Sequence, residues 1–277
     1  MTLRLSQFIP VVPLTFAVDA GLVGDLDLDT VITTGSAQQI DDLARNEADV
    51  VVTAIDNLFA WSQVVPDLRL IAQVEHTMTL RVYARPEFHR LEDLAGARFS
   101  VDARANGFSL LARRMLADRH VDVEFVEHGG VHNRLAALVA GHADATLLIP
   151  AFGSAAEDAG MNFVTSVDAL IPGLPGQALV GRESVTARDG LVAFLRALEA
   201  GVAVSSTLSD EAGIRTLERH DYGVGAEDAW RTRPRTLDVS QHGLQLLTDV
   251  RRSLGLLPPG ADLEALIDGR PLDAARH

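Results

Sequence analysis

Apolar residues in the middle of the chain recur with two different spacings. Between residues 98 and 150, three short apolar runs at 98–101, 121–126 and 143–149 alternate with two stretches whose apolar residues recur every three or four positions. Short apolar runs are typical of buried strands, and the longer spacing is typical of helices with one buried face. The alternation predicts a parallel sheet with right-handed crossover helices, the second of which turns Arg134 toward water.

A similar pattern occurs about 95 residues earlier in the chain. Gly35 aligns with Gly130, and Asp49 aligns with Asp144, without a gap between the two pairs. The offset is too long for a solenoid repeat. It predicts two similar α/β lobes; the alternative is that any two α/β segments share part of this chemistry.

Two further extended segments, near residues 77–84 and 177–181, predict a hinge of two strands between the lobes. From residue 187 onward the apolar spacing is helical. The predicted fold class is therefore α/β, with two Rossmann-like lobes joined by a two-strand hinge and a helical C-terminal region. The predicted boundaries are residues 1–80 plus 180–277 for lobe 1 and residues 81–179 for lobe 2.

Composition narrows the classes of function. The chain has 277 residues, of which 47% are apolar, enough for a globule with real cores. Its net charge of −14 argues against binding to nucleic acid or to anionic membrane surfaces. Cysteine and lysine are both absent, which excludes disulfides, thiolate metal sites, thiol nucleophiles and Schiff-base chemistry.

The sequence shows no membrane span and no export signal at its start. No stretch reaches the roughly 18 consecutive apolar residues of a span. The opening MTLRLSQFIP lacks a basic segment followed by an apolar one. We therefore expect no membrane insertion and a cytoplasmic location, or an extracytoplasmic one if an export signal has been trimmed.

The predicted strands end in turns that carry glycine and polar residues just before a helix begins. Right-handed crossovers bring such turns to one edge of a sheet, where small anions bind to free N–H groups. We expect the turns at 34–36 and 102–107 to face each other across a shared cleft. The candidate ligand-binding residues are Ser6, Gln7, Thr34, Gly35, Ser36, Asp56, Asn57, Asp102, Asn106, Gly107, His128, Gly129 and His132.

Different roles are expected within this set. N–H groups near Ser36, Gly107 and His132 could hold a carboxylate or sulfonate, and the amides of Asn57 and Asn106 could orient its oxygens. The carboxylate of Asp56 could accept from an amine or hydroxyl of the ligand. Ser36 could instead only cap its helix, with Gln39 completing a capping box.

Three histidines are candidates for acid–base chemistry. His76, His128 and His132, together with Asp102, are the expected catalytic residues if the protein is an enzyme, because imidazole titrates near neutral pH. The alternatives for the histidines are a structural or surface role, which we favour, and hydrogen bonding to a bound ligand. Histidines four residues apart need a third ligand to hold a metal, so we predict no metal site, and we predict no cofactor.

Four stretches, read in order, resemble a known family. They are PLTFAVDAGLVGD, TTGSAQQIDDLARNEADVVVTAIDN, LEDLAGARFSVD and HGGVHNRLAALVAGHADATLL. Together they resemble type II periplasmic binding proteins of the group that serves nitrate, sulfonate and taurine transporters, a superfamily that includes hydroxymethylpyrimidine-phosphate synthase. The resemblance implies two lobes that close over a small ligand.

Three hypotheses of function follow. The first is binding of a small organic anion or heterocycle, of the carboxylate or sulfonate class, as in ABC-transporter substrate-binding proteins, with a permease as partner if the protein is exported. The second is a cytosolic, cofactor-independent decarboxylase or lyase that acts on a small, possibly aromatic, acid through His and Asp. The third, an effector-sensing part of a regulator, is disfavoured by the acidic charge and by the lack of a helix-turn-helix region.

Overall fold

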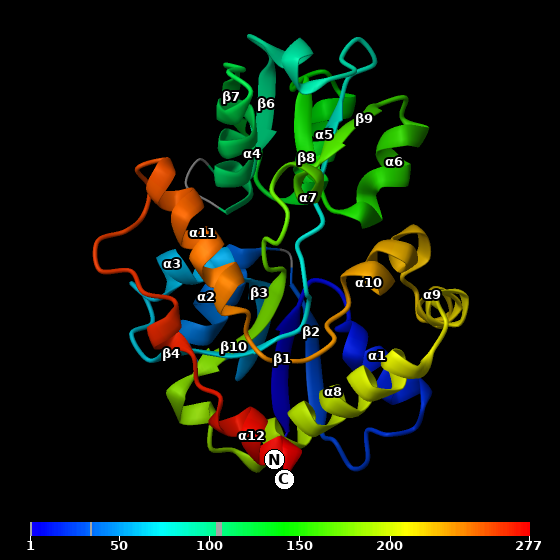
Figure 1. The fold of residues 1–277 in the computed structure, drawn as a ribbon, viewed down its shortest axis with the longest axis vertical. Coiled ribbons are helices and arrows are strands. Elements are labelled where there is room, and N and C mark those ends of the chain that lie inside the picture. The colour runs from blue at the N-terminus through cyan, green and yellow to red at the C-terminus, as the bar shows by residue number, and fades with distance from the viewer. Residues whose placement is uncertain (1, 34, 104–106) are drawn as a thin grey trace.

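Two five-stranded sheets form the framework of the protein. The structure is a computed structural model, and it describes residues 2–33, 35–103 and 107–277. One sheet has the strand order β2-β1-β3-β10-β4, and the other has the order β7-β6-β8-β5-β9. Each sheet is the centre of one lobe, and both chain termini lie at the end of lobe 1 that faces away from lobe 2 (Figure 1).

Lobe 1 combines parallel and antiparallel pairing. Strand β1 pairs in parallel with β2 and β3, whereas β10 pairs antiparallel with β3 and β4 because the chain returns there from lobe 2. The strands are β1 (Leu3–Gln7), β2 (Leu28–Ile32), β3 (Val50–Ala54), β4 (Leu68–Gln73) and β10 (Gln177–Arg182). The helices between them are α1 (Val12–Asp19), α2 (Ser36–Ala44) and α3 (Leu58–Trp61).

Lobe 2 repeats this topology. Strand β6 pairs in parallel with β7 and β8, and β5 lies antiparallel to β8 and β9. The strands are β5 (Arg81–Ala84), β6 (Arg98–Val101), β7 (Glu124–Glu127), β8 (Ala145–Leu148) and β9 (Asn162–Ser166). The helices are α4 (Gly107–Asp118), α5 (Val131–Val139), α6 (Gly153–Asp158) and α7 (Val167–Leu170). The predicted fold class is confirmed, including the strand–helix alternation between residues 98 and 150.

The aspartates of the sequence repeat have the same structural role in both lobes. Asp49 precedes β3 and accepts hydrogen bonds from the backbone N–H and the guanidinium of Arg4 in β1. Asp144 precedes β8 and accepts the same set from Arg98 in β6. Hydrogen bonds from Arg98 hold the pKa of Asp144 below its usual value. Each aspartate thus fixes the start of the central strand against its parallel neighbour.

The chain crosses between the lobes twice, through residues 74–80 and 167–176. The backbone N–H of Met78 and the hydroxyl of Thr77 both donate to the carbonyl of Leu174, at 3.0 and 2.9 Å. The two crossing segments therefore run side by side. They lie next to the hinge segments expected from the sequence, which themselves belong largely to β5 and β10.

The C-terminal region is helical, as predicted. Its helices are α8 (Asp189–Thr207), α9 (Asp210–Arg219), α10 (Ala226–Thr232), α11 (Gln241–Ser253) and α12 (Arg270–Arg276). Within the described ranges, α8 alone has a length and composition that would suit a membrane span. It packs against α1 and α12 and buries Leu191, Phe194, Leu195 and Leu198, so its apolar face belongs to the core of lobe 1. In Figure 1, α11 and α10 lie on opposite sides of the zone between the lobes.

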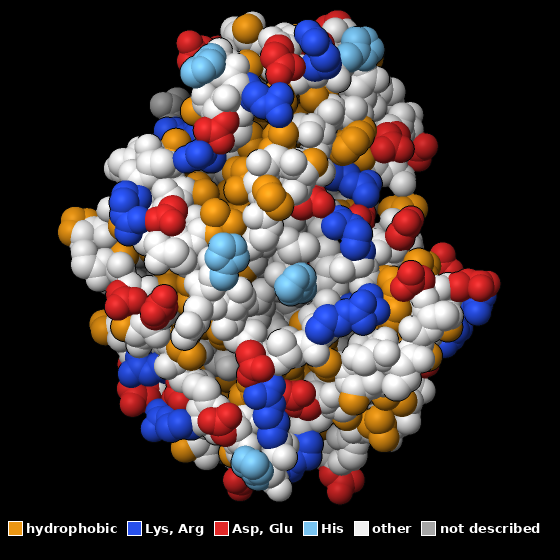
Figure 2. Space-filling model, viewed as in Figure 1, with side chains coloured by type: hydrophobic (Ala, Val, Ile, Leu, Met, Phe, Trp, Pro, Cys, Tyr) orange, Lys and Arg blue, Asp and Glu red, His pale blue; other side chains and the backbone are white. Residues whose placement is uncertain are grey.

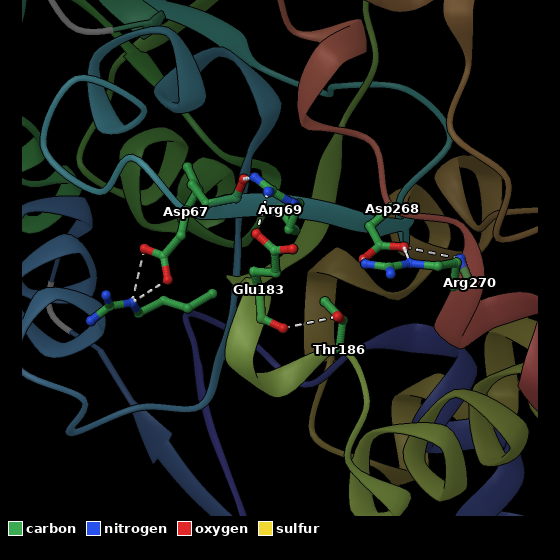
Figure 3. A network of polar contacts seen from close by, with 8 residues as sticks. Asp67, Arg69, Glu183, Thr186, Asp268 and Arg270 are labelled. Atoms are coloured by element: carbon green, nitrogen blue, oxygen red, sulfur yellow. Dashed lines mark hydrogen bonds and ion pairs between the residues drawn. The ribbon is translucent and has the colours of Figure 1, made fainter.

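A polar network ties the end of the chain to lobe 1 (Figure 3). Arg69 in β4 pairs with Glu183 just after β10, at 2.5 Å. Asp268 forms an ion pair with Arg270, and its backbone N–H donates to the carbonyl of Leu70 at 3.0 Å. The segment before α12 therefore covers β4, which would otherwise be an open sheet edge.

Candidate functional site

A cavity of about 440 Å³ lies between the two lobes and is lined by residues of both. This size falls within the range of sites for small organic molecules. Most of its lining is apolar, and includes Phe8, Val52, Met78, Phe108 and Val131. On the outer surface, acidic and basic side chains are interspersed over the face seen in Figure 2. The cavity therefore offers an apolar interior to a ligand, with a few polar groups to orient it.

Six residues of the predicted set line this cavity. Lobe 1 contributes Gly35, Ser36 and Asn57, and lobe 2 contributes Asp102, Gly107 and Gly129. The two turns that were expected to share a cleft thus contribute to the same cavity. Thr34 and Asn106 lie outside the described residues.

The end of β1 lies behind the cavity wall. Ser6 and Gln7 are buried, and neither is among the lining residues. The buried amide of Gln39 donates to the carbonyls of Ser6 and Val52, at 3.3 and 2.9 Å. The predicted capping box of Ser36 and Gln39 is therefore wrong, because Gln39 is turned inward to satisfy strand carbonyls, and Gly35 is the N-cap of α2.

Asp56 is the counter-ion of a buried arginine. Arg251 of α11 donates from its Nε to Oδ1 of Asp56 at 2.8 Å and also forms an ion pair through Nη2. The guanidinium lies over the ring of Phe59 at 4.7 Å. A Cβ added at Gly107 would come within 2.5 Å of Oδ2 of Asp56, so this carboxylate also lies directly against the start of α4. Asp56 joins α11, lobe 1 and lobe 2, and it is not among the residues that line the cavity.

The three predicted histidines also lie outside the cavity lining. His76 is exposed on the first crossing segment. Nδ1 of His128 lies 2.9 Å from the hydroxyl of Ser100, and the ring of His132 meets Phe152 edge-on at 4.6 Å. Asp102 therefore lines the cavity without any of its three proposed catalytic partners, and the enzyme hypothesis stays a prediction.

Arg134 is the first functional candidate that the sequence did not reveal. The expectation that it faces water is wrong: it is 2% exposed and lines the cavity from α5. Its Nη1 donates to the carbonyl of Gly129 at 2.9 Å, and its Nη2 donates to that of Leu147 at 3.2 Å. Burial lowers the pKa of Arg134, and the charge of Asp102 opposes this effect. Burial likewise raises the pKa of Asp102, and the charge of Arg134 opposes this effect, so each group favours the charged form of the other.

Arg233 is a second buried guanidinium on the cavity wall, just after α10. It is 5% exposed, its Nη1 donates to the carbonyl of Trp230, and its Cζ lies 3.1 Å from the centre of the Trp230 ring system. Its Nε–H has no acceptor, and no carboxylate of the described residues lies within ion-pair distance. Burial lowers the pKa of Arg233 to about 10. The indole that supports it is itself fixed, because its Nε1–H donates to Asp210 at 2.8 Å and its ring meets Phe16 at 5.7 Å.

Glu75 is a half-buried acid on the first crossing segment. Its Oε2 accepts a hydrogen bond from the backbone N–H of Gln177 at 3.1 Å. Burial raises the pKa of Glu75 from its ordinary value of 4.5 to about 7, opposed by hydrogen bonds from Gln177 and Thr232 and by the charge of Arg231. A Cβ added at Gly176 would lie 2.7 Å from Oε2, so the carboxyl group occupies the space that this glycine leaves open.

Helix α10 is joined to lobe 2 by ion pairs at the edge of the cavity. Asp228 pairs with Arg81 of β5 at 2.5 Å, and Arg231 pairs with Asp168 of α7 at 3.1 Å. Arg231 also donates to the hydroxyl of Thr79 on the crossing segment, at 3.2 Å. The helix that leads to Arg233 is therefore fixed to the second lobe in this conformation.

Comparison with known families identifies the chain. A family model described as NMT1/THI5 like matches residues 20–212, which is more than half of the chain. The chain belongs to the NMT1/THI5-like family. A search of curated protein sequences finds no match for this NMT1/THI5-like chain.

Solved structures share the fold of this NMT1/THI5-like protein at low sequence identity. The ligand-binding component of an ABC-type import system from Staphylococcus aureus, with zinc bound, has a TM-score of 0.79 at 15% identity and covers 99% of both chains. The alkanesulfonate-binding protein SsuA from Xanthomonas axonopodis pv. citri, bound to MOPS, has a TM-score of 0.76 at 18% identity and covers 97% of this chain and 98% of its own. The periplasmic nitrate-binding protein NrtA from Synechocystis PCC 6803 has a TM-score of 0.75 at 13% identity, with 99% of this chain and 88% of its own covered.

Proposed function

We propose that this protein binds a small organic anion, of the carboxylate or sulfonate class, in the cavity between its lobes. The observation that carries the proposal is Arg233, a buried guanidinium that lines the cavity without a carboxylate partner among the described residues. Removing an unpaired charge from water costs several kcal/mol. A bound anion would supply the missing counter-charge and offset that cost.

The shape of the guanidinium supports an oxyanion as the ligand. One nitrogen of Arg233 is held by the carbonyl of Trp230, while Nε–H has no acceptor among the residues that the structure describes. Arginine presents its donors as a planar fork that matches carboxylates and related oxyanions, and such charge-assisted bonds are about twice as strong as neutral ones. The starts of α4 and α5, near Gly107 and Gly130, line the cavity from lobe 2 and add favourable N–H dipoles for an anion.

We further propose that binding serves transport. The NMT1/THI5-like family membership, the fold shared with import-system binding proteins, and a hinge of two crossing segments all fit a protein that closes over its ligand and presents it to a membrane permease. The permease of an ABC transporter is the partner that this role requires, and an extracytoplasmic location is where the role would be carried out.

Isothermal titration calorimetry with a panel of small acids tests the anion proposal. The panel comprises butanoate, 4-methylbenzoate, butanesulfonate and their amino-substituted counterparts, titrated into the wild-type protein and the Arg233→Gln variant. The neighbouring Arg235→Gln variant is the matched control, because Arg235 is exposed.

We expect at least one acid to bind and Arg233→Gln to weaken it by roughly 10- to 150-fold, the range for a lost charged hydrogen bond. Small-angle scattering should show a more compact protein with that acid present. Equal affinities of the wild type and Arg233→Gln, or no binding by any acid, would overturn the proposal.

A further inference from the structure

The cavity contains more charged groups than Arg233, and most of them neutralise one another. Asp228 is held by Arg81 at 2.5 Å, and the charges of Asp102 and Arg134 favour each other's ionised forms. Among the described lining residues, one guanidinium, that of Arg233, and two carboxyl groups remain once these pairs are set aside. The carboxyl group of Asp221 is exposed, whereas that of Glu75 is half-buried. The cavity therefore presents a group of each sign to a ligand.

Residues of the returning chain segment fix the position of the Glu75 carboxyl group. The backbone N–H of Gln177 donates to Oε2 at 3.1 Å, and Gly176 leaves the room that the carboxyl group fills. Both residues belong to the return of the chain from lobe 2, whereas Glu75 belongs to the outward crossing. The carboxyl group is thus held where the two crossings meet, at the back of the cavity.

Glu75 and Arg233 are not partners of each other. No ion pair joins them, and the charged neighbours that act on Arg233 are Arg235 and Asp210. They therefore form two separate anchor points on one cavity wall, with apolar side chains such as Val74 and Met78 nearby.

We propose that the ligand is amphoteric: in addition to the acid group held by Arg233, it carries a protonated amine or a similar cationic N–H donor that bonds to the carboxylate of Glu75. This inference rests on the proposed function and narrows the ligand class within it. A cation at Glu75 offsets the burial of the carboxylate in the same way that an anion offsets the burial of Arg233. The mostly apolar lining of the cavity fits a carbon skeleton that joins the two polar ends.

The elevated pKa of Glu75, about 7, adds an independent readout. A protonated amine binds the ionised carboxylate, so binding at pH 6 should release the proton that Glu75 carries in the empty protein. The expected release is roughly 0.9 proton per ligand bound. Calorimetry in two buffers with different ionisation enthalpies measures this number directly.

The test uses pairs of acids that differ only in the amine: butanoate with 4-aminobutanoate, and 4-methylbenzoate with 4-(aminomethyl)benzoate. Each is titrated into the wild type, Glu75→Gln and, as a control, Glu218→Gln, whose side chain is exposed. We expect an amino acid of the panel to bind at least about tenfold more tightly than its amine-free counterpart. Glu75→Gln should abolish that preference and the proton release, whereas Glu218→Gln should keep both.

Several outcomes would overturn the inference. They are equal affinities within each pair in the wild type, a Glu75→Gln variant that weakens both members equally, or binding at pH 6 without proton release. If Glu75→Gln fails to fold, the pH dependence of the wild type replaces it: the preference for the amine must decrease, by up to about tenfold per pH unit, as the pH falls below about 7. Binding of amine-free acids alone would retain the proposed function and reject the amphoteric ligand. Binding of simple amines without an acid group would reject the proposed function and the amphoteric ligand with it.

Discussion

Glu75 should make the empty protein less stable at alkaline pH than at acidic pH. Its pKa lies near 7 in the folded protein and near 4.5 for an ordinary glutamate, because burial disfavours the ionised form. The unfolded chain therefore releases this proton earlier as the pH rises. The free energy of unfolding decreases through the window from about pH 4.5 to about pH 7, and the loss is complete above it. A difference of this size corresponds to about 3 kcal/mol.

The substitution Glu75→Gln isolates this contribution. Glutamine keeps a carbonyl oxygen to accept from the N–H of Gln177, yet it has no charge to bury. The gap in stability between Glu75→Gln and the wild type should therefore grow by up to about 3 kcal/mol between about pH 4.5 and about pH 8, in favour of the variant. Subtracting the wild type at each pH removes the contributions of all other titrating groups.

Urea unfolding followed by tryptophan fluorescence provides the measurement, with the m-value checked for constancy. The exposed Glu218→Gln variant should show a gap that does not change with pH. A gap for Glu75→Gln that is equal at both ends of the range would refute the reasoning, since it would mean that this carboxyl group ionises alike in the folded and unfolded protein. A gap that widens toward acidic pH would mean that folding lowers the pKa of Glu75 instead of raising it.

Three further predictions concern the supports of the site. Arg251→Met should lower the free energy of unfolding by about 3–5 kcal/mol in urea titrations, because it leaves the buried carboxylate of Asp56 unpaired. The double variant Arg251→Met/Asp56→Leu should recover most of this loss. A double variant whose loss equals the sum of the two single losses would contradict this. Gly213→Ala would place a Cβ 2.2 Å from the ring of Trp230, so it should displace the indole and weaken anion binding in calorimetry, an effect excluded by unchanged affinity. Arg231→Gln removes an ion pair between the lobes and should increase the radius of gyration of the empty protein in scattering, and an unchanged radius would show that this contact does not hold the lobes together.

The periodic parts of the chain were predictable because their signals are local. The spacing of apolar residues depends on neighbours within a few positions, and so does the place of Asp49 and Asp144 in equivalent turns. In the structure, each aspartate accepts hydrogen bonds from an arginine of the neighbouring parallel strand. Backbone geometry in a doubly wound lobe also follows from short-range rules, so the turns that contain Ser36 and Asp102 could each be expected at the carboxyl edge of the sheet of its own lobe.

The charged groups of the cavity were not predictable in this way. Asp56 and Arg251 are 195 residues apart in sequence, and no residue next to either one predicts that they form an ion pair. Glu75 and Arg233 lie in connecting segments without apolar periodicity, so the sequence does not show that they line a cavity. A group such as Arg134 looks like a surface residue until the packing of its helix turns it inward.

The placement of β10 has a consequence for the order in which the protein can assemble. The five strands of lobe 2 are consecutive in the chain. The sheet of lobe 1, in contrast, is complete only after β10 is inserted between β3 and β4. During synthesis on the ribosome, the first four strands therefore emerge with two unpaired edges, while the following segment can already collapse into a complete sheet. The half of the molecule that is made first should be the last to acquire its native structure, and those open edges are the places where a nascent chain is most exposed to misassociation.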